Sequence, residues 1–328
     1  MSAQHPDIPV VNVSRDTISP ALKKQDNRLT QVQNEEAVLY ALHRYGHLFT
    51  RQIRARVWPD SRTERQAQRT LANLKKAKQV LEQYAPDGCR GFCLSAAGAR
   101  RVSAVFKVVA VPGTSALKRC FFQVAHRAFS NDLCIWWETS NQPDGDGINS
   151  EYEIVSKKAL INKKEATFGK TRGKIPDALL LKKPFKDPVK GLVRPVGWCE
   201  VEMSDKPATA YAHLVSEICQ ILGGYGKNRF ELDDGKSEIH FVVVACPKAS
   251  HEMKLVRAVL THLESRTLNQ SYIKRGICIW NGSGALVTLE DWFSSHTEMK
   301  SWLIEMQVQR RYQRERENDA KERARRGH

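Results

Sequence analysis

Residues 175–207, IPDALLLKKPFKDPVKGLVRPVGWCEVEMSDKP, contain the most informative pattern in the chain. Two short apolar runs, DALLLKK and VGWCEVEM, stand on either side of a segment rich in proline, glycine and lysine. Short apolar runs bounded by turn residues are typical of buried strands, so we expect the two runs to pair as a hairpin. The first run nevertheless carries Asp177, and the second carries Glu200 and Glu202. Acids are seldom buried without a partner, so these three residues require a chemical explanation.

A shared metal ion is the explanation that we favour. Side chains alternate along a strand, so Glu200 and Glu202 point to the same face, and pairing of the strands brings Asp177 towards it. Clustered carboxylates repel one another unless a cation lies between them. Oxygen ligands suit Mg²⁺, or Mn²⁺ in its place, and such an ion activates water against a phosphodiester. The alternative is an edge strand whose charges discourage aggregation.

The sequence around the hairpin predicts a mixed α/β unit over residues 106–295. A helix is expected in SALKRCFFQVAHRAFSNDLCIWWE, a polar loop in NQPDGDGINSEYE and a strand in EYEIVSKKAL. After the hairpin, ATAYAHLVSEICQILGGYG reads as a helix, and the unbroken apolar run of EIHFVVVACP predicts a central strand. A further helix, HEMKLVRAVLTHLESRT, and a strand, GICIWNG, complete the order α-β-β-β-α-β-α-β. The acidic residues Glu151 and Glu153 are further candidate metal ligands.

Residues 34–105 predict a separate, smaller unit. NEEAVLYALHRYG has a helical spacing of apolar residues, TRQIRARVW forms a second short helix, and a third is expected at about 62–76. Ser61 and Glu64 have the spacing of a capping box for this third helix. QVLEQYAPDGCRGFCLS follows with a turn signal at its centre, which predicts a hairpin. Helix, helix, helix and hairpin is the order of a winged helix-turn-helix.

The third helix is the expected DNA-reading element, because in winged modules it lies in the major groove. Its apolar residues fall on one face, and basic residues occupy the rest. The expected DNA contacts are Arg62, Arg65, Arg69, Lys75 and Lys76. The alternatives are a small three-helix interaction module, or a charged helix face that is simply solvated.

Composition supports a polyanionic partner. The chain has 328 residues and a formal net charge of +16, which favours double-stranded DNA. No apolar run approaches the roughly 18 residues that a spanning helix needs, so we expect no membrane insertion. Most of the eight cysteines stand alone inside apolar runs, as reduced cytoplasmic cysteines do. Residues 1–33 are expected to form a disordered arm, and residues 296–328 a basic C-terminal helix or tail.

The pair Pro176-Asp177, followed by Glu200-x-Glu202 on the next strand, resembles the PD-(D/E)xK nuclease fold. That family places a lysine two residues after the second acid, where this chain has Glu202. The resemblance implies that the lysine helps to position the attacking water, and Lys206 is the nearest basic residue in the run able to replace it. The implied catalytic set is therefore Asp177, Glu200, Glu202 and Lys206, with the three acids as metal ligands.

The whole layout narrows this resemblance. A winged helix ending in CRGFCLSAAGARRV, a helix containing AHRAFSNDL and then the acidic strands are similar to the replication-relaxation proteins, which are related to the MobC-type plasmid mobilisation relaxases. The resemblance covers about residues 34–250 and implies a metal-dependent endonuclease or nickase acting at a plasmid or mobile-element origin. Other relaxosome proteins are then expected partners, and a homodimer stays open. The alternative is an inactive nuclease fold that serves as a DNA-binding regulator or relaxosome accessory protein.

Overall fold

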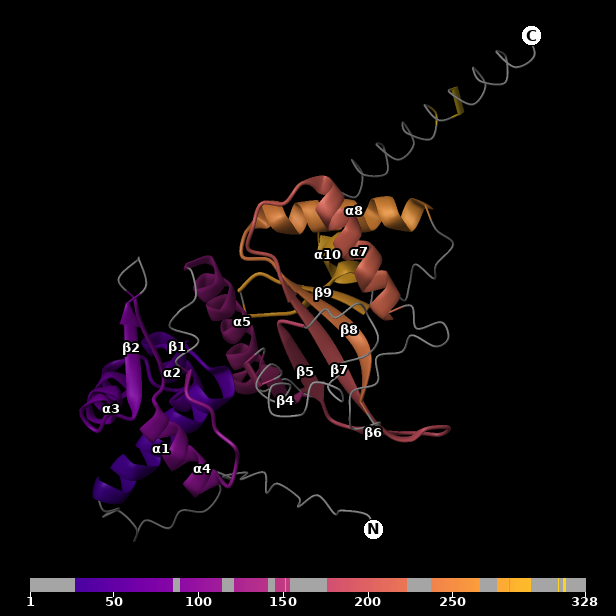
Figure 1. The fold of residues 1–328 in the computed structure, drawn as a ribbon. Helices are drawn as coiled ribbons and strands as arrows, with labels where there is room; N and C mark the ends of the chain where they lie inside the picture. Colours follow the sequence, from indigo (N-terminus) through magenta and orange to yellow (C-terminus); the bar gives the residue numbers. More distant parts are fainter. Residues whose placement is uncertain are drawn as a thin grey trace.

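The computed structural model describes residues 27–84, 89–113, 121–140, 145–150, 152–153, 176–222, 237–265, 276–282 and 284–295, together with residues 312, 315 and 316. The fold is a mixed α/β one, as expected. Figure 1 shows a smaller N-terminal unit beside a larger unit built on a mixed sheet.

The N-terminal unit packs helices against a small antiparallel sheet of strand order β1-β3-β2. Its helices bury one apolar face each, as in α1, where Val38, Leu39 and Leu42 are fully buried. Gly46 ends α1 with a φ of +74°, which favours glycine, and a Cβ there would also collide with the ring of Tyr152. The elements of this unit are α1 (Asn27–Tyr45), β1 (Leu48–Phe49), α2 (Thr50–Val57), α3 (Arg65–Lys76), β2 (Val80–Tyr84), β3 (Arg90–Leu94) and α4 (Ala96–Phe106).

The larger unit follows the strand order β10-β9-β8-β7-β5-β4, with β6 paired to the start of β7. Strand β7 is antiparallel to β5 and parallel to β8, and β8 is parallel to β9. The elements are α5 (Phe121–Thr139), β4 (Gly145–Ser150), β5 (Ala178–Lys182), β6 (Phe185–Asp187), β7 (Gly191–Val201), α7 (Ala208–Leu222), β8 (Ser237–Ala245), α8 (Ala249–Ser265), β9 (Ile277–Trp280), β10 (Val287–Thr288) and α10 (Leu289–Ser295). The expected hairpin is confirmed, because Ala178 pairs with Cys199 and Leu181 with Val196.

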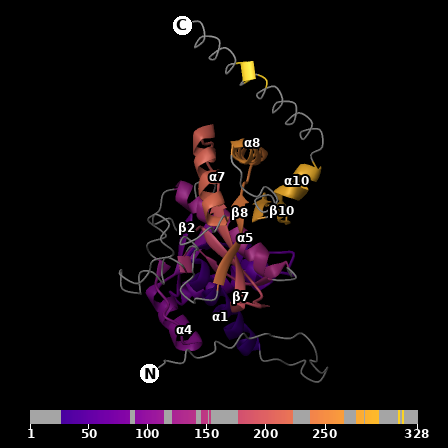
Figure 2. The same cartoon turned by 90° about the vertical axis from the view of Figure 1, so that its right-hand side faces the viewer.

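Helices cover both faces of this sheet. One apolar cluster joins α7, α8 and α10 to alternate residues of β7, β8 and β9, and these helices lie in the upper part of Figure 2. The other face packs against α5, which lies between the sheet and the N-terminal unit in Figure 1. A sheet buried on both faces accounts for the unbroken apolar runs of β8 and β9.

The two units share one apolar core. A single cluster of buried side chains contains Leu42 of α1, Leu133 of α5 and Val243 of β8. Burial of apolar surface is the main favourable contribution to folding, so this continuity ties the units together. The expected boundary near residue 105 therefore separates two sets of elements that are packed on each other.

Two expectations about local structure were wrong. Residues 27–33, assigned to the disordered arm, form the first turns of α1, because the segment lacks glycine and proline and continues directly into the amphipathic part of the helix. Residues 145–150, expected to be a loop, form β4, because pairing with β5 buries Ile148 and Ser150 despite two glycines. The strand expected in EYEIVSKKAL falls almost wholly outside the described residues.

Residues 1–26 and most of the expected C-terminal tail, 296–328, also lie outside the described residues. Among the helices that the structure describes, none combines the length and the apolar character required to cross a bilayer. The cysteines of the described segments are all free, and every one except Cys89 is buried.

Candidate nucleic-acid interface and acidic strand ends

The outer face of α3 is exposed and basic. Its inner face buries Ala67, Leu71 and Leu74 against the N-terminal core, which fixes the orientation of the helix. The side chains expected to contact DNA are all exposed, namely Arg62, Arg65, Arg69, Lys75 and Lys76. Arg62 precedes the helix, which begins at Arg65 with Glu64 as its N-cap and no side-chain capping bond, so the expected capping box does not form.

Lys75 has a partner within the protein. Its ammonium group is paired with Glu82 of β2, and the hydrogen bond and charge of that carboxylate raise the pKa of Lys75. Arg90 of β3 approaches the other oxygen of Glu82 at 3.9 Å. Lys75 therefore connects α3 to the hairpin, whereas Arg65, Arg69 and Lys76 have no such ion pair among the described residues.

Amide side chains on the same face were missed by the sequence reasoning, which scored charge alone. Gln66, Gln68 and Asn73 are exposed beside the arginines of α3. Asparagine and glutamine can make bidentate hydrogen bonds to adenine, and arginine can do so to guanine. The sequence contained the signal that could have identified them, since solvation of a helix face does not require amide side chains beside arginines.

Asp177 lies immediately before β5, at the end of the hairpin where β7 finishes. Its N–H donates to the carbonyl of Cys199 at 3.0 Å, and its Oδ2 accepts from the N–H of Val201 at 2.7 Å. Asp177 is thus hydrogen-bonded to the two residues that flank Glu200, namely Cys199 and Val201. The Nε2 of His126, on α5, lies 3.4 Å from the same Oδ2, and Ser130 donates to the Asp177 carbonyl at 2.9 Å.

Glu200 and Glu202 occupy the carboxyl end of β7. Both are buried, with 7% and 3% of their surface exposed. Trp198, which packs in the core beneath α7 and α8, donates from Nε1 to Oε1 of Glu200 at 2.5 Å. The N–H of Glu202 continues the parallel ladder to the carbonyl of Ala245 at 2.9 Å.

The three acids do not form one centre. Glu200 shares the face of Trp198, under α7 and α8, whereas the carboxylate of Asp177 meets His126 from the opposite side. The expected common face was wrong for Asp177 because this residue precedes the strand and its carboxylate caps a backbone N–H. Lys206 donates to Oε1 of Glu202 at 2.7 Å, so the lysine neutralises that acid.

A metal ion at the strand ends would therefore have fewer than three of these acids as ligands. The residues that the structure describes contain no group of three or more histidine, cysteine or acidic side chains placed to hold a metal. Mg²⁺ is often held by only one or two carboxylates, with waters and substrate phosphate completing its shell. Of the three acids, Asp177 fits this requirement, because its Oδ1 makes no hydrogen bond within the described part of the chain, whereas Glu200 lies on the other side of the sheet and accepts from Trp198.

A polar cluster under α7 lies beside Glu202. The carbonyl of Glu202 lies 3.0 Å from Nδ1 of the buried His251, at the start of α8. Oε2 of Glu202 and the hydroxyl of Tyr211 are both buried without a hydrogen-bond partner in the described structure. Burial, with the nearby charges of Cys246 and Glu202, raises the pKa of Tyr211, so the phenol stays protonated.

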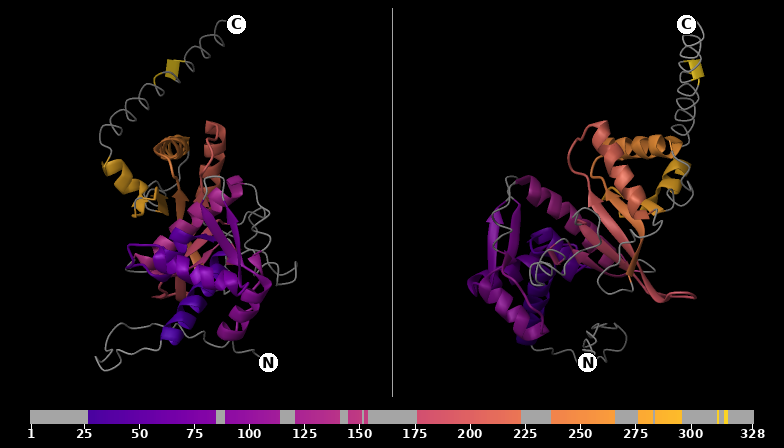
Figure 3. Two further views of the ribbon diagram at one scale, coloured as in Figure 1. Left: turned by 90° about the vertical axis from the view of Figure 1, so that its left-hand side faces the viewer. Right: turned by 45° about the vertical axis from the view of Figure 1, so that its right-hand side comes forward.

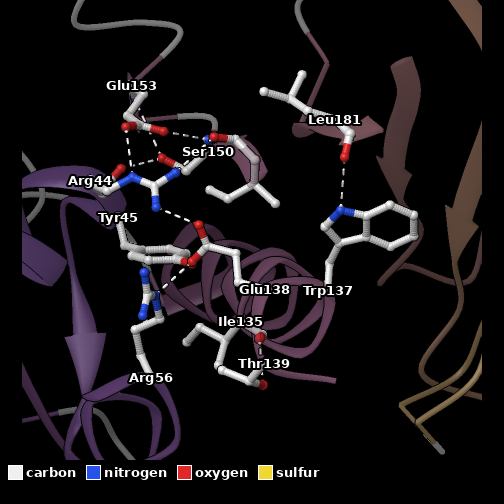
Figure 4. Close-up of polar contacts among 11 residues, drawn as sticks. Arg44, Tyr45, Arg56, Ile135, Trp137, Glu138, Thr139, Ser150, Glu153 and Leu181 are labelled. Carbon is white, nitrogen blue, oxygen red and sulfur yellow. Dashed lines mark hydrogen bonds and ion pairs between the residues drawn. The ribbon is translucent and has the colours of Figure 1, made fainter. Parts of the chain in front are cut away.

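A second polar cluster joins the N-terminal unit to α5 (Figure 4). Glu138 accepts from Arg44 through Oε1 and from the hydroxyl of Tyr45 through Oε2, the latter at 2.6 Å. Arg56 Nε also lies 2.6 Å from Oε2, although not in hydrogen-bonding geometry. Burial raises the pKa of Glu138, but the charges of Arg44 and Arg56 outweigh this effect, so its pKa lies below the ordinary value.

Glu153 belongs to this junction and not to a metal site. Its Oε1 accepts from Nε of Arg44 at 3.1 Å, and its Oε2 accepts from the N–H of Ser150 at 3.1 Å. Burial alone lowers the pKa of Arg44, yet Glu153 and Glu138 together hold that pKa well above its ordinary value. The guanidinium therefore bridges α1 to both α5 and the end of β4.

Comparison with protein-family models, with curated proteins and with solved structures finds no match to this chain. The function is therefore inferred from the residues and contacts described above.

Proposed function

We propose that the protein binds double-stranded DNA through its N-terminal unit, which acts as a winged helix with α3 in the major groove. The observation that carries this proposal is the two-sided character of α3: an apolar face fixed in the core and an outer face of arginine, lysine, glutamine and asparagine. The order helix, strand, helix, helix and hairpin, with the sheet order β1-β3-β2, supports the same assignment. The net charge of +16 favours the encounter.

Different residues of this surface have different roles in the proposal. Arg65 and Lys76, at the two ends of α3, contact phosphates and supply affinity without reading sequence. Arg69 and Asn73 lie one turn apart near the middle of the exposed face, where base edges are read. The hairpin β2–β3, tied to α3 by Lys75 and Glu82, acts as the wing.

The test is a binding titration at several salt concentrations on duplexes selected from a random pool by the wild-type protein. Arg69→Ala should weaken binding to the selected sequence by about 1–3 kcal/mol and reduce discrimination against other sequences. Arg100→Ala is the matched control, because this exposed arginine lies on α4, outside the proposed surface. Equal losses for Arg69→Ala and Arg100→Ala, or binding that does not depend on salt, would exclude the proposed surface.

Metal-dependent nicking of the bound DNA is a second candidate function. The order α5-β4-β5-β7-α7-β8 is that of the PD-(D/E)xK core, and Asp177 is held against both neighbours of Glu200. In this proposal Asp177 would hold Mg²⁺ or Mn²⁺ through Oδ1, with waters and substrate phosphate completing the shell, and the ion would supply charge stabilisation and an activated water. Lys206 keeps Glu202 in its buried position, and His126 orients the carboxylate of Asp177.

DNA binding by the N-terminal unit together with metal-dependent nicking would make the protein a mobilisation enzyme of the replication-relaxation type. Such an enzyme would act in the cytoplasm on a plasmid or mobile-element origin. The version without cleavage is a DNA-binding regulator or relaxosome accessory protein on the same scaffold. The two versions make the same prediction for Arg69 and opposite predictions for Asp177.

A plasmid-relaxation assay separates the two versions. Supercoiled DNA carrying the region that encodes the protein is incubated with Mg²⁺ or Mn²⁺ and with wild type, Asp177→Asn or Arg69→Ala. Open circles from wild type, but not from Asp177→Asn, would support the nickase, provided that Asp177→Asn still binds DNA. Intact binding with no open circles under either metal would leave the DNA-binding regulator as the function.

A further inference from the structure

The two-stranded ribbon formed by β6 and the first residues of β7 extends beyond the sheet. Phe185 pairs with Val193 and Lys186 with Leu192, and a short turn closes the ribbon between Asp187 and Gly191. The ribbon projects away from both the helices and the N-terminal unit, at the lower right of Figure 1 and of the right-hand view in Figure 3. The major groove of DNA admits a two-stranded ribbon of this kind, and the narrower minor groove admits apolar side chains from its tip.

The tip of the ribbon is apolar and exposed. Val189, beside Pro188, has 91% of its surface exposed, and Leu192 has 56% exposed. Isolated exposed apolar residues are common, but these lie together at the end of a projection whose exposed side chains also include Phe185, Lys183, Lys186 and Lys190. Nothing in the folding of the ribbon requires a valine at its most exposed position.

The turn is braced, so the tip is held in one conformation. Oδ1 of Asp187 accepts from the N–H of Val189 and from that of Lys190, both at 2.8 Å. Gly191 follows with a φ of +80°, a conformation that side chains other than glycine rarely adopt. A rigid tip loses little conformational entropy when it is inserted into a binding partner.

Basic residues surround this tip. Residues 182–194, KKPFKDPVKGLVR, contain five lysine or arginine side chains and one acid. Lys190 pairs with Glu238 at 2.6 Å and Arg194 with Asp146 at 3.3 Å, which holds these two against the sheet. Lys186 makes no ion pair or hydrogen bond with any residue that the structure describes, and it stands on the same face as Leu192.

We propose that this ribbon is a second DNA-binding element, in which Lys186 and its basic neighbours contact phosphates and Val189 enters a groove as an apolar wedge. The inference depends on the DNA binding proposed above, and the charge of the ribbon is what selects DNA as the occupant. Apolar residues that enter a minor groove unstack a base step and bend the duplex, and proline and aliphatic side chains serve this purpose. The ribbon therefore bends the DNA that α3 recognises.

The position of the ribbon sets the expected footprint. Glu200 lies nine residues after Gly191 along β7, a distance of about 30 Å at roughly 3.3 Å per residue. This distance corresponds to roughly nine base pairs of duplex at about 3.4 Å per pair. Contact by the ribbon should therefore extend protection well beyond the base pairs that face the strand ends.

The test measures affinity, salt dependence and bending on duplexes selected by the full-length wild-type protein, with a dye at each end. Lys186→Ala should lower the slope of log affinity against log salt by about 1, because one phosphate contact is lost. Val189→Ser should leave that slope unchanged and abolish the protein-induced change in energy transfer between the dyes. The controls are Lys248→Ala, an exposed lysine beyond the far end of β8, and Val109→Ser, a valine with 69% exposure.

The ribbon proposal would be overturned if Lys186→Ala and Val189→Ser matched their controls in the salt slope and in bending. The proposed DNA binding would stand if Arg69→Ala still weakened binding in the same experiment. Failure of the wild-type protein to enrich any duplex from the random pool would instead overturn the proposed function and this inference with it. Dissociation of a dimer by Val189→Ser, with unchanged bending, would assign the tip to contacts between copies of the chain and would also overturn the proposal.

Discussion

The junction around Glu138 and the end of β7 around Glu202 are both polar and buried, but they differ in how fully their hydrogen bonds are satisfied. Both oxygens of Glu138 accept hydrogen bonds, from Arg44 and Tyr45. Only one oxygen of Glu202 does so, and the nearby hydroxyl of Tyr211 has no partner among the described residues.

This difference separates a structural role from a functional one. A network whose hydrogen bonds are all satisfied holds two elements in one arrangement. When one member is removed, the remaining polar groups stay buried without a partner, and the free energy of unfolding falls. Unsatisfied buried groups reduce stability, so their presence in a native structure requires another explanation, such as contact with a ligand or water. We therefore expect substitutions in the junction to alter stability strongly and substitutions near Glu202 to alter it little.

The largest effect is expected for Glu138→Ala. The substitution leaves the guanidinium of Arg44, whose side chain is 13% exposed, without its Glu138 partner, and it removes the acceptor of Tyr45. Removing one member of a buried ion pair costs about 3–5 kcal/mol in the free energy of unfolding. Urea denaturation followed by circular dichroism measures this loss. A change below about 1 kcal/mol would show that the network is no more important than a surface pair.

His47 should make stability depend on pH. Burial, together with the charge of Arg127, lowers the pKa of His47 from 6.5 to about 4, so the folded protein keeps the ring neutral. Between these values the unfolded chain binds a proton that the folded protein does not. The contribution is therefore complete above about pH 6.5 and is lost as the pH falls towards 4.

The measurement compares urea denaturation of the wild type and His47→Gln across this range. The wild type should lose on the order of 3 kcal/mol more than the variant on acidification. His47 also lies against Gly91, so the variant must first give a folded protein at neutral pH. Parallel curves for the two proteins would contradict the prediction.

Asp132→Ala should have a smaller effect than Glu138→Ala. Asp132 accepts two hydrogen bonds from Arg51, at 2.8 Å each, and one from Gln52, but the side chain of Arg51 is 54% exposed. Water can replace the carboxylate at the arginine, so we expect a loss of about 1 kcal/mol, mostly from Gln52. Thermal and urea unfolding beside Glu138→Ala test the ranking, and a reversed order would refute the distinction between the two pairs.

The smallest effect on stability is expected for Tyr211→Phe. The hydroxyl has no hydrogen-bond partner in the described structure, so its removal should change the free energy of unfolding by less than about 0.5 kcal/mol. A change in DNA cleavage or in metal-dependent DNA binding without a change in stability would assign the hydroxyl to a ligand. A loss above about 1 kcal/mol would indicate a structural hydrogen bond, for example to a buried water.

The sequence predicted the elements whose pattern is local and strongly periodic. The amphipathic part of α1, the inner face of α3 and the strands β5, β7, β8 and β9 follow from apolar periodicity, which reports burial directly. The sequence did not predict β4, because the residues of this glycine-rich edge strand have a low strand propensity and the strand forms through pairing with β5. It also missed the first turns of α1, where no apolar pattern marks the helix.

The candidate site was predicted only in part, because the sequence reports alternation within a strand and does not report contacts made elsewhere. Alternation along β7 predicts a common side for Glu200 and Glu202, and the pairing of β5 with β7 places Asp177 at their end of the hairpin. Alternation could not apply to Asp177, which precedes its strand and uses its carboxylate to cap Val201. The pairing of Glu202 with Lys206 also depends on how the chain turns after β7.

The amino-acid sequence was sufficient to predict the mixed α/β class, the basic outer face of α3, and the presence of acids where two buried strands finish. These features depend on residue type and spacing within one element, and such spacing fixes which side chains share a face. Tertiary packing made the two units share a core, paired Glu153 with Arg44, and brought His126 of α5 to the carboxylate of Asp177. Those outcomes depend on which surfaces meet, and the free energy of burying apolar groups and pairing charges is realised only after distant segments have packed together.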